Sequence, residues 1–209
     1  MDQNASPARL RIAILSLPGI GIAKAPKVLA ALEGGPPDSA EAFAEQLSDA
    51  ETAKKTKDFD RSDIDYAFDR AKRIIAESYE AGIQILTEDD SILPRGFWEI
   101  PKPPFVMYAR GGIADLASKL RVAVIGTREP TEWGRTCGQK IAHTLASRGV
   151  CVVSGLAIGC DTAGHQGCLE AGGTTAAVMA HGLDQVYPAA NRQLAAEILD
   201  SGGCLLSEY

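Results

Sequence analysis

From residue 82 onward, short apolar runs alternate with helical patterns, and this alternation limits the possible folds more than any other feature. The runs are rich in β-branched residues, which predicts strands at Ile83–Thr87, Phe105–Tyr108, Val122–Ile125, Val150–Val153, Thr174–Met179 and Cys204–Leu206. Helices are expected between the later runs, at Thr136–Arg148, Asp161–Ala171 and Asn191–Leu199. Such alternation predicts an α/β fold, a Rossmann-like and mostly parallel sheet with helices on both faces.

The loop that follows the third run, Gly126–Pro130, offers groups that suit a phosphate. Gly126 lets the backbone approach a ligand closely. Thr127 brings a hydroxyl and an amide, and Arg128 brings a forked guanidinium. A plain strand-to-helix turn with a surface arginine is the alternative interpretation.

The loop that follows the fourth run begins with the small residues Ser154 and Gly155 and reaches Gly159. These residues predict a backbone cradle whose N–H groups point at an anion. Asp161 stands where a residue capping the next helix is expected, and His165 on that helix is expected to be packed rather than catalytic.

The loop that follows the fifth run carries Tyr187, an aromatic platform, and Asn191, which can cap the next helix. Arg192 lies in the first turn of that helix, where a cation opposes the helix dipole, so it is explained by a nearby anion or by simple solvation. Because parallel strands end at one edge of a sheet, these loops together predict a rim that binds one phosphate or a row of them.

The first part of the chain has a different pattern. Two short helices around a tight turn are expected over residues 9–33, and an amphipathic helix over Asp63–Tyr79. We therefore expect a small helical domain over residues 1–81 and the Rossmann-like domain over residues 82–209.

Composition restricts the kind of DNA site and the cellular compartment that we expect for this protein. The formal net charge is −6, and an acidic chain does not coat nucleic acid broadly, so any DNA site must be local. The five cysteines form no Cys-x-x-Cys pair, which is typical of reduced thiols. No apolar run approaches a membrane span, so a soluble, cytoplasmic protein with no membrane partner is expected. We also expect no cofactor.

Enzymatic and metal-binding alternatives find little support in the sequence. No Gly-x-Gly-x-x-Gly motif follows a strand, and Ser154 lacks the Gly-x-Ser-x-Gly context that a triad with His165 would need. Cys160, His165 and Cys168 lack a fourth zinc ligand. We expect no catalytic residue and no metal. A nucleotide-binding or nucleotide-hydrolysing protein, and a scaffold without DNA binding, stay open as alternatives.

Several separated motifs, in this order, resemble the DprA/Smf family of DNA-processing proteins. They are Val122–Arg128, Val152–Ala157 with Asp161 and Ala163–His165, Gly182–Asp184 with Tyr187, Pro188 and Asn191, and finally Leu206–Tyr209. The resemblance spans about residues 82–209 and implies that the protein binds and protects single-stranded DNA. It also implies that the protein helps to load RecA recombinase in natural transformation, and that it forms a homodimer.

The resemblance implies phosphate contacts by residues of all three loops. The predicted DNA-phosphate-binding residues are Gly126, Thr127, Arg128, Ser154, Gly155, Gly159, Asn191 and Arg192. Ile158 stands where many relatives have a basic residue, and Cys160 replaces a usual isoleucine. Family members normally continue beyond Tyr209 with elements that supply much of the dimer surface, so the domain is expected to be incomplete.

Near the N-terminus, Leu17–Ala25 resembles a helix-hairpin-helix of the SAM-like kind. In such modules the backbone amides of the hairpin donate hydrogen bonds to a DNA phosphate, often next to a lysine. The resemblance implies DNA contacts by Gly19, Gly21 and Lys24. A helical hairpin with no role in DNA binding is the alternative.

Overall fold

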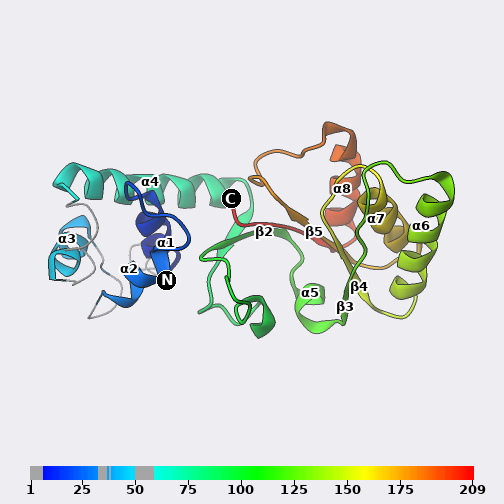
Figure 1. Cartoon of the computed structure of the whole chain (residues 1–209), viewed down its shortest axis with the longest axis horizontal. Helices are drawn as coiled ribbons and strands as arrows, with labels where there is room; N and C mark the ends of the chain where they lie inside the picture. Colours follow the sequence, from blue (N-terminus) through cyan, green and yellow to red (C-terminus); the bar gives the residue numbers. More distant parts are fainter. Residues whose placement is uncertain (1–6, 33–36, 38, 50–58) are drawn as a thin grey trace. The chain divides into compact units, whose positions relative to one another are not determined.

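The structure is a computed structural model that describes residues 7–32, 37, 39–49 and 59–209 (Figure 1). The chain divides into two compact units. The first holds the described residues up to Ala81 together with Ile85–Asp89 and Lys102–Val106, and the second holds Gly82–Gln84, Asp90–Pro101 and Met107–Tyr209. None of the described helices is both long enough and apolar enough to cross a membrane.

The first unit is helical in its N-terminal part. Its helices are α1 (Pro7–Ser16), α2 (Ala25–Ala30), α3 (Ala40–Asp49) and α4 (Arg61–Glu80). Helix α4 begins earlier than its apolar spacing predicts, because Asp60 and Asp63 form a reciprocal capping box at its first turn. Helices α1 and α2 flank the predicted tight turn, but the assignment of this unit to the helix-hairpin-helix or SAM-like class stays a prediction.

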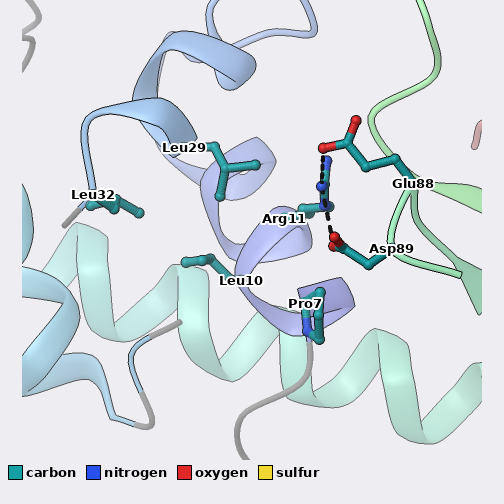
Figure 2. A pocket seen from close by; sticks show the side chains of 7 residues that line it. All are labelled: Pro7, Leu10, Arg11, Leu29, Leu32, Glu88 and Asp89. Carbon is teal, nitrogen blue, oxygen red and sulfur yellow. Dashed lines mark hydrogen bonds and ion pairs between the residues drawn. The ribbon is translucent and has the colours of Figure 1, made fainter. Parts of the chain in front are cut away.

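A buried arginine holds part of the first unit together. The Arg11 side chain is only 7% exposed, and its guanidinium donates to Glu88 at 2.7 Å and to Asp89 at 3.4 Å (Figure 2). The same guanidinium lies over the ring of Phe105, 5.0 Å from its centroid. A buried guanidinium left without a partner would be destabilising, although the carboxylates of Glu88 and Asp89 are themselves more than half exposed. These contacts therefore tie α1 to the segments 85–89 and 102–106.

The second unit contains most of a six-stranded sheet, whose order is β1-β2-β6-β5-β4-β3. The strands are β1 (Ile83–Leu86), β2 (Met107–Gly111), β3 (Arg121–Ala123), β4 (Cys151–Ser154), β5 (Thr175–Met179) and β6 (Cys204–Ser207). Strands β3 to β6 pair in parallel, and β2 pairs with β6 in the antiparallel sense. The predicted class, a mostly parallel α/β sheet with helices, is confirmed.

Three helices of the second unit lie close to their predicted ranges, and a fourth, Ala114–Ser118, was not predicted. They are α5 (Ala114–Ser118), α6 (Glu132–Ala146), α7 (Cys160–Glu170) and α8 (Arg192–Asp200), with short 3-10 turns at Arg95–Phe97 and Ala189–Asn191. Because β3 to β6 follow one another in spatial order, right-handed crossovers place α6, α7 and α8 on one face. The hydrophobic clusters agree with this placement. Helices α6 and α7 pack on Val152, and α8 packs on Ala177, which points to the same face of the sheet.

The opposite face is less covered near β3 than a prediction of helices on both faces implies. Ala123 and Val178 point to that face and are exposed, as is Ile125 just beyond β3. Further along the sheet on the same face, Ala176 and Leu206 are buried. The described residues therefore cover this face only in part.

Helices α6 and α7 approach each other closely because small residues line their contact. A Cβ atom on Gly167 would collide with the carbonyl oxygen of Gln139 on α6. One on Gly164 would come within 3.1 Å of Val124, just after β3, so α7 also lies close to that strand end. By contrast, a Cβ on Gly138 would lie 4.0 Å from the Cβ of Ala163, an ordinary contact. The close packing of α6 on α7 therefore depends on Gly167.

We expect Gly167→Ala to lower the free energy of unfolding by about 2 kcal/mol, because backbone must move to admit the methyl group. Urea denaturation followed by circular dichroism measures the change. Gly138→Ala is the matched control on the facing helix, where alanine gains helix propensity of up to about 1 kcal/mol without a collision. Equal effects of the two substitutions would contradict this account of the packing.

Candidate nucleic-acid interface

The loop after β3 is exposed from Gly126 to Glu129. The Thr127 hydroxyl accepts a hydrogen bond from the amide of Glu129 at 3.2 Å, which turns the chain toward α6. Thr131 then caps α6 by accepting from the amide of Gly134 at 3.1 Å. Within the described part of the chain, the exposed guanidinium of Arg128 has no hydrogen-bond or ion-pair partner, so it is available to a ligand.

The loop after β4 is shaped by the carboxylate of Asp161 on α7. Its Oδ2 atom accepts from the amides of Gly155 at 3.1 Å and Ala157 at 3.3 Å. Asp161 was expected to cap its own helix, but α7 begins after Gly159, and Asp161 instead closes the loop that precedes it. Two amides of the predicted cradle are therefore already occupied by an anion of the protein itself.

The first two loops are locked together at Gly159. This residue has a φ of 95°, and a Cβ atom there would collide with the carbonyl of Thr127 and lie 2.6 Å from that of Arg128. The amide of Cys160 donates to the Thr127 carbonyl at 3.0 Å. Only glycine tolerates both the conformation and the contact, so Gly159 sets the position of Arg128 relative to the second loop.

The third loop is joined to the second by Asn191. The Asn191 side chain is buried, and its amide group donates to the carbonyl of Leu156 at 2.8 Å and to the hydroxyl of Thr162 at 3.0 Å. Leu156 is fully buried with a φ of 60°, a left-handed conformation that costs free energy in a non-glycine residue. The bond from Asn191 helps to hold Leu156 in that conformation.

A pocket of about 140 Å³ lies where the loops meet. It combines one cation, backbone of the second loop and a mostly apolar wall. Its lining residues are Arg128, Gly155, Ala157, Ile158, Ala180, His181, Tyr187 and Pro188. The predicted rim thus brings Arg128 and Gly155 to one place, with Gly159 beside them, while Arg192 is exposed at the start of α8 and is not among the lining residues.

Comparison with known proteins identifies the family of this chain. A family model described as DNA recombination-mediator protein A matches residues 84–209, which is more than half of the chain. The chain belongs to this family.

Individual relatives named Smf and DprA align with more than half of this chain. Protein Smf of Synechocystis is 41% identical over 140 residues, which cover 66% of this chain and 35% of that protein. DNA processing protein DprA of Bacillus subtilis is 30% identical over 149 residues, which cover 71% of this chain and 50% of that protein. The chain thus spans about a third to a half of the length of these relatives.

Solved structures of DprA proteins resemble this chain. The X-ray structure of DprA from Streptococcus pneumoniae has a TM-score of 0.71 and 25% identity, covering 99% of this chain and 68% of that one. A structure of DprA from Helicobacter pylori has a TM-score of 0.53 and 32% identity, covering 61% of this chain and 55% of that one. The Helicobacter pylori structure gives insights into the single-stranded DNA binding mode of that protein.

Two of the predicted phosphate-binding side chains have other partners in this DprA-family chain. Ser154 is buried, and its hydroxyl donates to the carbonyl of Val124 at 2.6 Å. The Asn191 amide group donates to Leu156 and Thr162 within the protein. Both side chains hold loops in place, so a contact of either residue with phosphate would have to use its backbone.

Sequence reasoning did not single out His181, which lines the pocket. Its Nδ1 lies 2.9 Å from the carbonyl of Gly182, and its Nε2 accepts from the amide of Tyr187 at 3.3 Å. The signal available in the sequence was a histidine two residues after the end of an apolar strand, close to a tyrosine–proline pair. His181 shapes the third loop by joining its two ends.

His165 is packed in the core, as expected. It is fully buried, and its Nδ1 lies 2.8 Å from the hydroxyl of Thr175, which itself donates to the carbonyl of Val152. Nδ1 therefore carries the proton. Cys168 is buried against the carbonyl of Thr174, and no group of three or more potential metal ligands occurs among the described residues.

The hairpin between α1 and α2 has Gly19 and Gly21 exposed, with Gly19 at a φ of 73°. The ammonium group of Lys24 donates to the carbonyl of Gly19 at 3.1 Å across the turn. This contact places a cation at the hairpin, and a DNA contact there stays a prediction.

Burial of His165 makes the stability of the protein depend on pH. Burial lowers the pKa of His165 to about 4, whereas the pKa of a histidine in an unfolded chain is about 6.5. Below about pH 6.5, His165 binds a proton in the unfolded state but stays neutral in the folded state. The free energy of unfolding therefore falls as the pH falls toward 4. We expect the free energy of unfolding to drop by about 2 kcal/mol between about pH 7 and about pH 5, measured by urea denaturation.

His165→Gln is expected to remove most of this drop, because glutamine does not titrate. His143→Gln, at an exposed position of α6, is the control and is expected to keep the pH dependence of the wild type. An undiminished drop in His165→Gln would contradict the assignment.

Proposed function

We propose that this chain binds single-stranded DNA at the rim formed by the three loops, and that it acts by binding rather than by catalysis. The observation that carries the proposal is Arg128, an exposed guanidinium with no partner among the described residues, in a pocket with the second loop. The similarity to Helicobacter pylori DprA, a protein with a single-stranded DNA binding mode, supports the same ligand class.

Backbone amides supplement the single cation of the pocket. Gly155 and Ala157 give their amides to Asp161, but the described residues offer no acceptor to the amides of Arg128, Ile158 and Gly159. The amides of Ile158 and Gly159 lie just before α7, whose N-terminus favours a nearby anion. We propose that one phosphate is held there, with Gly126 and Thr127 as further backbone neighbours and Arg192 as a cation for a second phosphate.

The local character of this site agrees with the acidic chain. A net charge of −6 disfavours long-range attraction of DNA, so affinity must come from short-range contacts at the rim. Single strands also expose bases and bend freely, which lets successive phosphates reach a narrow rim.

We expect Arg128→Ala to weaken binding to oligothymidylate about tenfold, because a charge-assisted bond to phosphate is lost. The slope of log affinity against log salt should fall by about 0.7, the value for one phosphate contact on a single strand. Fluorescence anisotropy with the full chain over a salt series measures both quantities.

Arg148→Ala is the matched control, since Arg148 is an exposed arginine in the turn after α6 and does not line the pocket. It is expected to leave the affinity unchanged. If both variants bind like the wild type, or if the wild type binds no single strand, the proposed site is wrong.

The wider role proposed for the chain is protection of single-stranded DNA and assistance to RecA, within a homodimer. We expect the wild type to raise the rate of RecA-dependent ATP hydrolysis on single-stranded DNA, and Arg128→Ala to raise it less. Light scattering reports the oligomeric state in the same samples. A chain that binds DNA but does not change the RecA rate would refute assistance to RecA and leave DNA binding standing.

A further inference from the structure

A second pocket belongs to the first unit and has no part in the rim (Figure 2). Its walls come from α1, from the end of α2 with the turn after it, and from the turn that follows β1. Its volume is about 370 Å³, near the lower end of ligand pockets, about 300–1,000 Å³, so it accepts one or two side chains. Its lining residues are Pro7, Leu10, Arg11, Leu29, Leu32, Glu88 and Asp89.

One side of this pocket is aliphatic. Leu10 is buried beneath it, whereas Leu29 and Leu32 are only half-buried. Figure 2 shows the three leucines on one side of Arg11 and the two carboxylates on the other. An aliphatic group placed on the leucines would remove their remaining apolar surface from water, which stabilises a complex.

Arg11 brings a cation to the pocket, but its guanidinium is already engaged. It donates to Glu88 and Asp89 and lies over the ring of Phe105, and the side chain is only 7% exposed. None of the other described lining residues is a lysine or an arginine. The described lining therefore offers no free cation to a phosphate, and this pocket does not suit DNA.

The other side of the pocket has an unbalanced negative charge, because two carboxylates share one guanidinium. The side chains of Glu88 and Asp89 are 55% and 58% exposed. Each uses one oxygen for Arg11, and the described residues give no partner to the other oxygen. Arg11 thus holds both carboxylates in place with an oxygen of each still available, which favours a cation and repels phosphates.

The lining therefore recognises two chemical features, an aliphatic group and a cation. Among the described lining residues none is aromatic, so a cage for a quaternary ammonium group is lacking. None of them has a hydroxyl or carboxamide side chain that would orient the polar groups of a metabolite. An aliphatic side chain next to a lysine or arginine is a common feature of a basic amphipathic segment of a protein.

From this charge complementarity we infer that the pocket docks a basic peptide segment of a partner protein. An aliphatic side chain of the segment packs on the three leucines, and an adjacent lysine or arginine pairs with Glu88 and Asp89. The inference goes beyond the proposed function, since it adds a protein-docking site in the first unit to the DNA site at the rim.

The test uses acetyl-leucyl-arginine amide as the probe and methyl NMR spectra of the full chain with labelled leucines. The probe is expected to shift the methyl signals of Leu10, Leu29 and Leu32 in a saturable way. Acetyl-glycyl-arginine amide, which lacks the aliphatic side chain, should bind at least about tenfold more weakly. Acetyl-leucyl-glutamine amide, which lacks the cation, should bind about two- to fivefold more weakly, as expected for an exposed ion pair.

Two variants separate the two features. Asp89→Asn keeps an acceptor for Arg11 and is expected to reduce the preference for the arginine probe over the glutamine probe. Leu29→Ala should weaken both leucine probes by the same factor and keep that preference. Asp69→Asn is the matched control, because Asp69 is exposed on α4 and does not line the pocket, and it is expected to bind every probe like the wild type.

Four results would overturn the inference. The first is a wild type that shows no saturable shift of the leucine signals with any probe. The second is equal affinity for isoamylamine, an aliphatic amine without a peptide group, which would make the pocket a site for small amines. The third is a shift of the same signals as the protein concentration rises without a probe, which would place a second copy of the chain there. The fourth is an unchanged arginine preference in Asp89→Asn, which would remove the assigned ion pair.

Discussion

The rim depends on the close passage of the second loop over the first at Gly159. With a φ of 95° and no side chain, Gly159 lies against the carbonyls of Thr127 and Arg128, and the next amide, that of Cys160, bonds to Thr127. Any Cβ atom at this position would separate the loops. Because of this contact, Arg128 and Ile158 border the same pocket although they come from different strand ends.

A buried carboxylate organises the same region in a way that limits anion binding. Asp161 takes the amides of Gly155 and Ala157, so the second loop is stable without a ligand. As a result, fewer amides remain for phosphate, and a negative charge lies within the loop. The proposed DNA site therefore relies on a few well-placed groups, which suits a chain whose overall charge of −6 repels DNA at longer range.

Local patterns predicted the six strands and helices α6, α7 and α8 closely but missed the short helix α5, and the deviations in the element bounds have physical causes. Strand β2 starts at Met107 rather than Phe105, because Phe105 and Val106 pack in the first unit, so an apolar run was longer than the strand it contained. Helix α6 starts at Glu132 rather than Thr136, because Thr131 caps it. Apolar periodicity shows the buried face of a helix but not its polar first turn.

The sequence by itself determined the order of strands and helices, and with it the three loops that meet at the carboxyl edge of the sheet, because periodicity and parallel pairing are local or topological properties. Only the tertiary structure decided which polar groups of those loops remain available. Ser154 and Asn191 look like ligands in the sequence, yet their side chains bond to the carbonyls of Val124 and Leu156. A hydrogen bond depends on where a distant partner lies in space, and the residue type alone does not contain that position.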